Sequence, residues 1–83
     1  MRCISVYTRD FGSFSDLYER IVASPPAEDE EIELEGITVS GAGDVPEGYI
    51  ERLRGRPDVV VMRERERGAT ILQHGGLFEI CLP

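Results

Sequence analysis

The apolar residues of this 83-residue chain fall into short segments, most of which have the two-residue period of a β-strand. The alternation predicts strands over residues 2–8, 32–34, 37–39, 59–63, 69–73 and 77–82. One longer segment instead has helical spacing, formed by Phe14, Leu17, Tyr18, Ile21 and Val22. The order β-α-β-β-α-β-β-β predicts an α+β, two-layer fold, in which two or three helices cover one face of a mixed, mostly antiparallel sheet of about six strands.

Capping and turn residues give the expected element boundaries. Ser13 is expected to cap the first helix, which ends where Pro25 and Pro26 follow Ser24. The strand alternation changes phase at Glu35-Gly36, through either a bulge or a tight turn, and the turn is slightly favoured. Residues 40–43 are expected to form a loop, and Asp44 to cap a short second helix carrying Tyr49, Ile50 and Leu53 on its inner face.

The length of the chain indicates a single compact domain spanning residues 1–83. It contains no apolar run long enough to span a membrane, and its first residues alternate like a strand instead of forming a signal peptide. A cytoplasmic protein that does not bind membranes is therefore expected. Cys3 and Cys81 show no C-x-x-C pattern, so two buried thiols are favoured over a disulfide framework.

The charge of the chain is strongly acidic and unevenly distributed. Sixteen Asp and Glu residues stand against nine Arg, with no Lys, which gives a net charge of -7. Phosphate repulsion therefore argues against nucleic acid as a partner. The acids are concentrated in residues 1–47, whereas residues 48–83 are nearly balanced.

Six carboxylates lie within residues 28–35 without any intervening base. They belong to Glu28, Asp29, Glu30, Glu31, Glu33 and Glu35. Repulsion among clustered carboxylates is relieved by a hard divalent cation with oxygen ligands, so these residues are candidate calcium ligands. The spacing is not that of an EF-hand, and binding is expected to be weak. The alternatives are that this stretch is a solvated face or that it binds a basic protein surface. Asp44 and Glu47 are less favoured candidates for calcium ligands.

Other motifs carry less weight. Gly41-Ala42-Gly43 lacks the third glycine of a dinucleotide loop, and the absence of Lys excludes a P-loop. His74 lies in a glycine-rich turn, and no nucleophile can be placed beside it from the sequence. A zinc site formed by His74, Cys3 and Cys81 has no diagnostic spacing either. An enzyme is therefore not expected.

The segment Arg63-Glu64-Arg65-Glu66-Arg67 alternates in charge with the period of a strand. This period would place Arg63, Arg65 and Arg67 on one face. Such runs are usually solvated hairpin ends, but an arginine face could also dock onto an acidic partner, or onto the acidic stretch of another copy.

Taken whole, the chain resembles a family of small acidic proteins of unknown function from methanogenic archaea. The resemblance rests on residues 2–12 (RCISVYTRDFG), 26–41 (PAEDEEIELEGITVSG) and 43–47 (GDVPE). It implies a compact α/β domain, a role connected with methanogenesis, no assigned reaction and possible calcium binding through acidic residues.

These observations together predict a monomeric, non-enzymatic binding module whose acidic surface binds a divalent cation, calcium, weakly. The alternative is a metal-independent protein-protein interaction module that uses either the acidic edge or the Arg63, Arg65 and Arg67 face.

Overall fold

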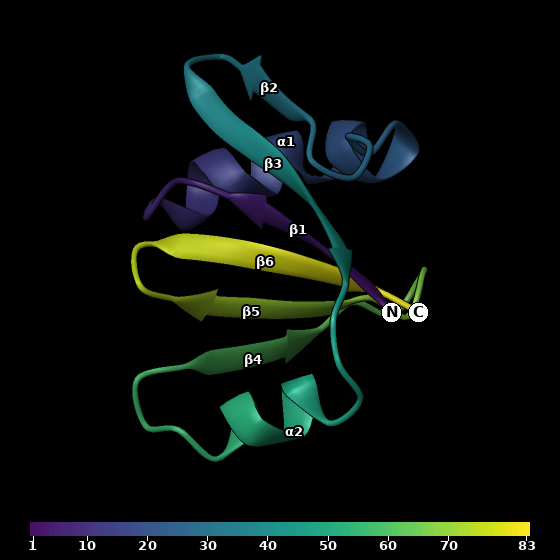
Figure 1. Cartoon of the computed structure of the whole chain (residues 1–83). Coiled ribbons are helices and arrows are strands. Elements are labelled where there is room, and N and C mark those ends of the chain that lie inside the picture. Colours follow the sequence, from purple (N-terminus) through teal and green to yellow (C-terminus); the bar gives the residue numbers. More distant parts are fainter.

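The structure is a computed structural model that describes the backbone of residues 1–83 and every side chain except that of Ala42. Its elements follow the predicted order (Figure 1). They are β1 (Arg2–Val6), α1 (Phe11–Ala23), β2 (Glu31–Leu34), β3 (Ile37–Asp44), α2 (Tyr49–Arg54), β4 (Val60–Arg63), β5 (Thr70–His74) and β6 (Leu77–Leu82). The predicted α+β class is confirmed.

The strands form one six-stranded sheet in the order β2-β3-β1-β6-β5-β4. Each neighbouring pair is antiparallel. The first strand is central, because β1 lies between β3 and β6. The two chain ends therefore lie close together at one end of the sheet (Figure 1).

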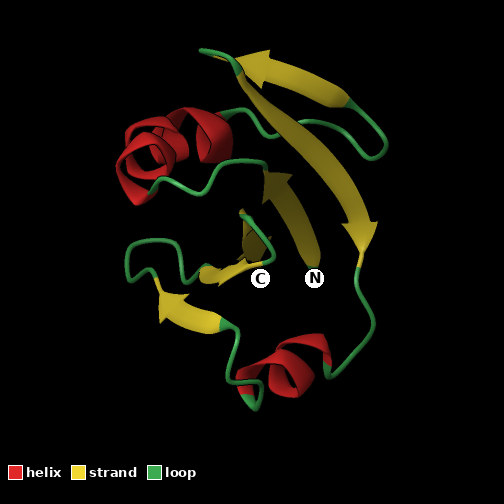
Figure 2. Cartoon of the chain, turned by 90° about the vertical axis from the view of Figure 1, so that its left-hand side faces the viewer, coloured by secondary structure: helices red, strands yellow, loops and turns green.

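The two helices lie on opposite faces of the sheet, so the expectation of a two-layer arrangement with both helices on one face is wrong (Figure 2). The central strands explain the difference, because they are apolar on both sides. Ile4, Val6, Phe78 and Ile80 pack on the α1 side, whereas Cys3, Leu72 and Cys81 form a separate cluster on the α2 side. Both faces of these strands must therefore be covered.

Helix α1 supplies much of the main core. It buries Phe14, Leu17, Tyr18 and Ile21, all of which belong to the predicted apolar stripe. The Phe14 ring stacks on Phe78 of β6 with 4.2 Å between ring centroids. The helix begins earlier than predicted, because the Asp10 carboxylate, and not Ser13, caps it by accepting from the Ser13 amide.

The β2–β3 hairpin contains the predicted tight turn. Glu35 and Gly36 both have positive φ, 51° and 81°, which is typical of a two-residue type I′ turn. The expected loop over residues 40–43 and the Asp44 helix cap are wrong, because β3 continues through Asp44. Gly41 allows this, since a Cβ there would lie 2.1 Å from the carbonyl oxygen of Ala27, which crosses the strand.

Helix α2 is short and only lightly packed. It begins after Gly48, whose φ of 85° is left-handed, and no side chain caps its first turn. None of its six residues is fully buried. Tyr49, Ile50 and Leu53 nevertheless rest on the Cys3, Leu72 and Cys81 cluster, so the predicted inner face of this helix is confirmed.

Candidate functional site

A buried carboxylate forms the centre of a polar cluster beneath α2. Glu79 of β6 is only 7% exposed. The Tyr49 hydroxyl donates to both of its oxygens, at 2.8 and 3.0 Å, and the His74 Nε2 lies 2.5 Å from Oε1. These two polar partners offset the cost of burying the carboxylate.

Strand register brings these groups together. Glu79 pairs with Leu72 of β5 and with Ser5 of β1, and paired residues share a face of the sheet. His74 lies two residues beyond Leu72, so its side chain emerges on the same α2 face. Tyr49 reaches the cluster from the first position of α2. Burial, followed by the hydrogen bond to Glu79, raises the pKa of Tyr49 to about 12.

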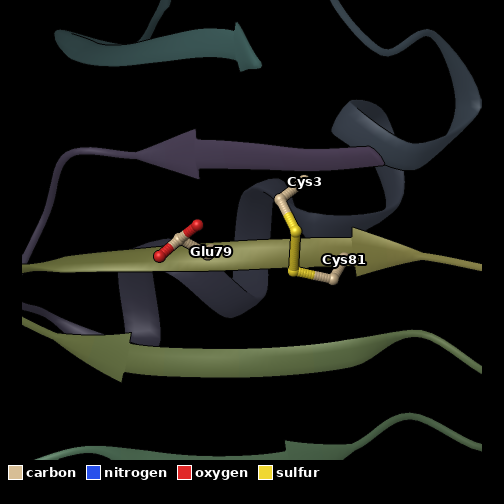
Figure 3. Close-up of side chains that lie close together, drawn as sticks. All are labelled: Cys3, Glu79 and Cys81. Carbon is tan, nitrogen blue, oxygen red and sulfur yellow. A yellow bond between two sulfur atoms is a disulfide. The ribbon is translucent and has the colours of Figure 1, made fainter. Parts of the chain in front are cut away.

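The two cysteines lie beside Glu79 on the same face (Figure 3). Cys3 and Cys81 are directly paired across β1 and β6 and form a disulfide, with 4.0 Å between their Cα atoms. The expectation of two buried thiols is therefore wrong. Residues near opposite ends of the sequence became cross-strand neighbours, a juxtaposition that no local spacing could indicate.

One cluster of potential metal ligands stands out among the side chains that the structure describes. The ligating atoms of Cys3, Glu79 and Cys81 all lie within 4.8 Å of one another, and no other described set of three Asp, Glu, His or Cys side chains meets this distance. His74, considered with the cysteines from the sequence, instead lies against the Glu79 carboxylate. Sequence reasoning missed Glu79 and the role of Tyr49, although a lone acid inside the apolar strand 77–82 was a detectable signal.

The predicted calcium ligands are spread around the hairpin end of the sheet. Glu31 and Glu33 project from β2, and Glu35 in the turn forms a 2.7 Å ion pair with Arg20. The Glu30 carboxylate accepts from the Ala27 amide. Glu28 packs against Gly43, Asp29 lies in the preceding turn and Asp44 is 3.7 Å from the N-terminal amine. In this arrangement, no three described carboxylates of the stretch meet the same 4.8 Å criterion.

Strand β2 forms one open edge of the sheet and carries two acidic side chains on one face. Register places Glu31 beside Ser40 and Glu33 beside Thr38, on the side of the sheet where α2 lies. The helix itself sits at the distant β4 end, so this part of the face has no helix over it (Figures 1 and 2). Both carboxylates are exposed, and neither has an ion-pair partner among the described residues.

The predicted arginine face does not form. Strand β4 ends at Arg63, and the following residues turn because the Glu64 carboxylate accepts from the amides of Glu66 and Arg67, at 2.7 and 2.8 Å. These hydrogen bonds hold the pKa of Glu64 below its usual value, and the bond from the Arg67 amide has the largest effect. Arg67 then forms a 2.7 Å ion pair with Glu19 of α1. The strand period therefore stops before Arg65.

No protein-family model matches this chain, and neither the curated proteins nor the solved structures contain a match. The resemblance to proteins of methanogenic archaea therefore stays a prediction. Within the described part of the chain, no helix is long and apolar enough to span a membrane.

Proposed function

We propose that this protein is a non-catalytic binding module that pairs the free edge of β2 with an extended, basic segment of a protein partner. The observation that carries the proposal is the combination of an unpaired strand edge with two exposed carboxylates, Glu31 and Glu33, on one face. Addition of a strand to such an edge is a common mode of peptide recognition.

The hydrogen-bond pattern of the hairpin supports this mode. In a two-residue hairpin, the pair next to the turn exchanges both backbone hydrogen bonds, and bonded pairs then alternate along the strands. Leu34 and Ile37 form that pair, so Ile32 and Val39 form the next bonded pair. The amides and carbonyls of Glu31 and Glu33 consequently point away from β3 toward the open edge. They can pair with an added strand.

The two faces of β2 define the chemistry of the partner. An added strand would place alternate side chains beside Glu31 and Glu33, where opposite charges in neighbouring strands stabilise pairing. The intervening side chains would lie beside Ile32 and Leu34, which are partly buried against the α1 core. The partner segment is therefore one that alternates Arg or Lys with Val, Ile or Leu.

The test is amide hydrogen exchange followed by NMR, with a six-residue peptide that alternates Arg and Val. A peptide that alternates Glu and Val is the charge-reversed control. We expect the basic peptide to protect the amides of Glu31 and Glu33, because they gain hydrogen bonds, and we expect the acidic peptide to protect neither. Binding without protection of these amides, or protection along residues 60–63 instead, would refute the proposal.

Variants separate the backbone contribution from that of charge. Glu33→Pro removes an outward amide on an edge strand, where proline is tolerated, and should abolish peptide binding without loss of the fold. Glu31→Gln combined with Glu33→Gln should weaken binding about fivefold, as expected for two exposed ion pairs. Asp16→Asn combined with Glu47→Gln removes the same charge elsewhere and should leave the affinity within about twofold of the unmodified protein.

Calcium binding by residues 28–35 stays a prediction, and the same NMR spectra can test it. Titration with calcium, repeated with magnesium, should give saturable shifts confined to this stretch if a site forms there. Small linear shifts at every carboxylate would mean that the stretch is a solvated face. The cytoplasmic location and the monomeric state also stay predictions, and the disulfide favours a non-reducing compartment over the cytoplasm.

A further inference from the structure

The cluster around Glu79 has a composition that a structural disulfide alone does not explain. A carboxylate that is 7% exposed lies within 4.8 Å of both cysteine sulfurs, in a small apolar layer beneath α2. A disulfide needs no carboxylate beside it, and an acid buried this deeply needs hydrogen-bond partners to offset the cost of its burial. The two thiolates that reduction would release, however, would form a complete set of soft and hard donors with this carboxylate.

The donor atoms suit a zinc ion. Zinc binds cysteine sulfur at about 2.3 Å and carboxylate oxygen at about 2.0 to 2.2 Å, in a tetrahedral arrangement whose ligand atoms lie roughly 3.5 to 4 Å apart. The Glu79 oxygen already lies within 4.8 Å of both sulfurs, and the two sulfurs, which are bonded to each other here, would move apart after reduction to reach this spacing. All three side chains also project from strands β1 and β6 at the centre of the sheet, which holds their Cα atoms in place.

The partners of Glu79 correspond to the outer shell that metal ligands require. Tyr49 donates to both carboxylate oxygens, and His74 Nε2 contacts Oε1. Hydrogen bonds of this kind fix the orientation of a ligating carboxylate, and their loss typically lowers metal affinity by about 10- to 100-fold.

We propose that the reduced form of this protein binds one zinc ion through Cys3, Cys81 and Glu79, with water in the fourth position. A dithiol reductant supplies two electrons and two protons, which break the S–S bond and give two thiols, while the reductant becomes a disulfide. Zinc then displaces the two thiol protons to solvent and takes the Glu79 carboxylate as its third protein ligand. A disulfide oxidant reverses these steps: it takes two electrons from the two thiolates and two protons from solvent, becomes a dithiol, and leaves the Cys3–Cys81 bond re-formed and the metal released.

Helix α2 allows reagents to reach this buried site. It covers the cluster with side chains that are only partly buried, and no side chain caps its first turn. Segments with few buried contacts open locally at low free-energy cost, so reductant and metal can enter without global unfolding.

The experiment compares Co²⁺ and Zn²⁺ binding to the full chain before and after reduction with a phosphine. After reduction, we expect one equivalent of Co²⁺ to produce visible d–d bands of tetrahedral coordination and a near-ultraviolet thiolate charge-transfer band. Zn²⁺ should displace the cobalt and bind at least about a hundredfold more tightly than to the oxidised chain. Equal binding by the oxidised chain would overturn the proposal.

Variants identify the ligands. Glu79→Gln should weaken zinc binding to the reduced chain by at least about a hundredfold, Tyr49→Phe by about tenfold, and the exposed Asp16→Asn by less than twofold. Unchanged affinity of Glu79→Gln would overturn the proposal, because the metal would then be held by Cys3 and Cys81 alone. Should reduction unfold the chain, recovery of the dispersed NMR spectrum by stoichiometric Zn²⁺ would support the site, and failure to recover it would refute the site.

Discussion

Reduction of the Cys3–Cys81 disulfide should remove a large part of the stability of this protein. The bond joins residues separated by 78 positions, so it restrains nearly the whole unfolded chain. In the loop-entropy model, closing a loop of this length removes about 15 cal/mol/K of unfolded-state entropy, or about 4.5 kcal/mol at 25 °C. Domains are typically stable by only about 5 to 15 kcal/mol, so the reduced chain should be marginally folded.

The assay is equilibrium unfolding in urea at 25 °C, with and without a phosphine reductant and with a chelator to exclude metal. The oxidised and reduced chains should be compared by their free energies of unfolding and not only by their urea midpoints. The reason is that the cross-link also makes the unfolded state more compact and changes the m-value. A double variant, Cys3→Ala with Cys81→Ala, is the control, and its stability should not depend on the reductant.

A difference below about 1 kcal/mol between the oxidised and reduced chains would refute this reasoning. It would mean that β1 and β6 hold the two ends of the chain together without the covalent bond, or that the unfolded chain already keeps them close. Zinc added after reduction should restore part of the lost stability only if the metal site forms, so the two ideas can fail separately.

Three further perturbations follow from the structure. Gly41→Ala places a Cβ 2.1 Å from the Ala27 carbonyl oxygen and should destabilise the fold by about 1 to 3 kcal/mol in urea unfolding. In the control Gly55→Ala the added Cβ meets open space, and the cost should be less than about 0.5 kcal/mol. Equal destabilisation by the two variants would contradict the close approach of Ala27 to Gly41. The pKa of Glu64 is lowered in the folded state, so its ionised carboxylate stabilises the fold above pH 4.5, and this stabilisation is lost as the pH falls through the folded-state pKa. Glu64→Gln should therefore reduce the dependence of the melting temperature on acid pH. An unchanged dependence of the melting temperature on pH would exclude this stabilising role. The pKa of Tyr49 is raised to about 12, so its protonated hydroxyl stabilises the fold below pH 10, and this stabilisation is lost as the pH approaches 12. Tyr49→Phe should lower the free energy of unfolding by about 1 to 3 kcal/mol at neutral pH and reduce the loss of stability at alkaline pH. A loss of stability at alkaline pH as steep as that of the unmodified protein would contradict this prediction.

The order of elements could be determined from the sequence because it depends on local signals. The helical stripe from Phe14 to Val22, the alternation in the strands and the glycine of the Glu35-Gly36 turn each act within a few residues. Each of these elements forms in the structure. Errors arose where a distant contact overrides the local preference. Gly41 and Gly43 look like loop residues, but they lie in β3 because the 26–28 segment passes over them.

The candidate sites depended on strand order, which the sequence alone did not determine. Pairing of β1 with β6 brings Cys3 next to Cys81 and places Glu79 beside them, although these residues share no diagnostic spacing. Hydrogen bonds from the turn to Glu64 ended the strand that would have aligned the arginines.

Local residue preferences therefore determined which segments became helices and strands. They also indicated that the acidic stretch 28–35 includes a strand, which is β2 in the structure. The assignment of the helices to opposite faces, the free edge of β2 and the buried Glu79 cluster were decided only in the tertiary structure. The physical reason is that side-chain period depends on neighbours in sequence, whereas burial, pairing and ligand proximity depend on which strands become neighbours in space.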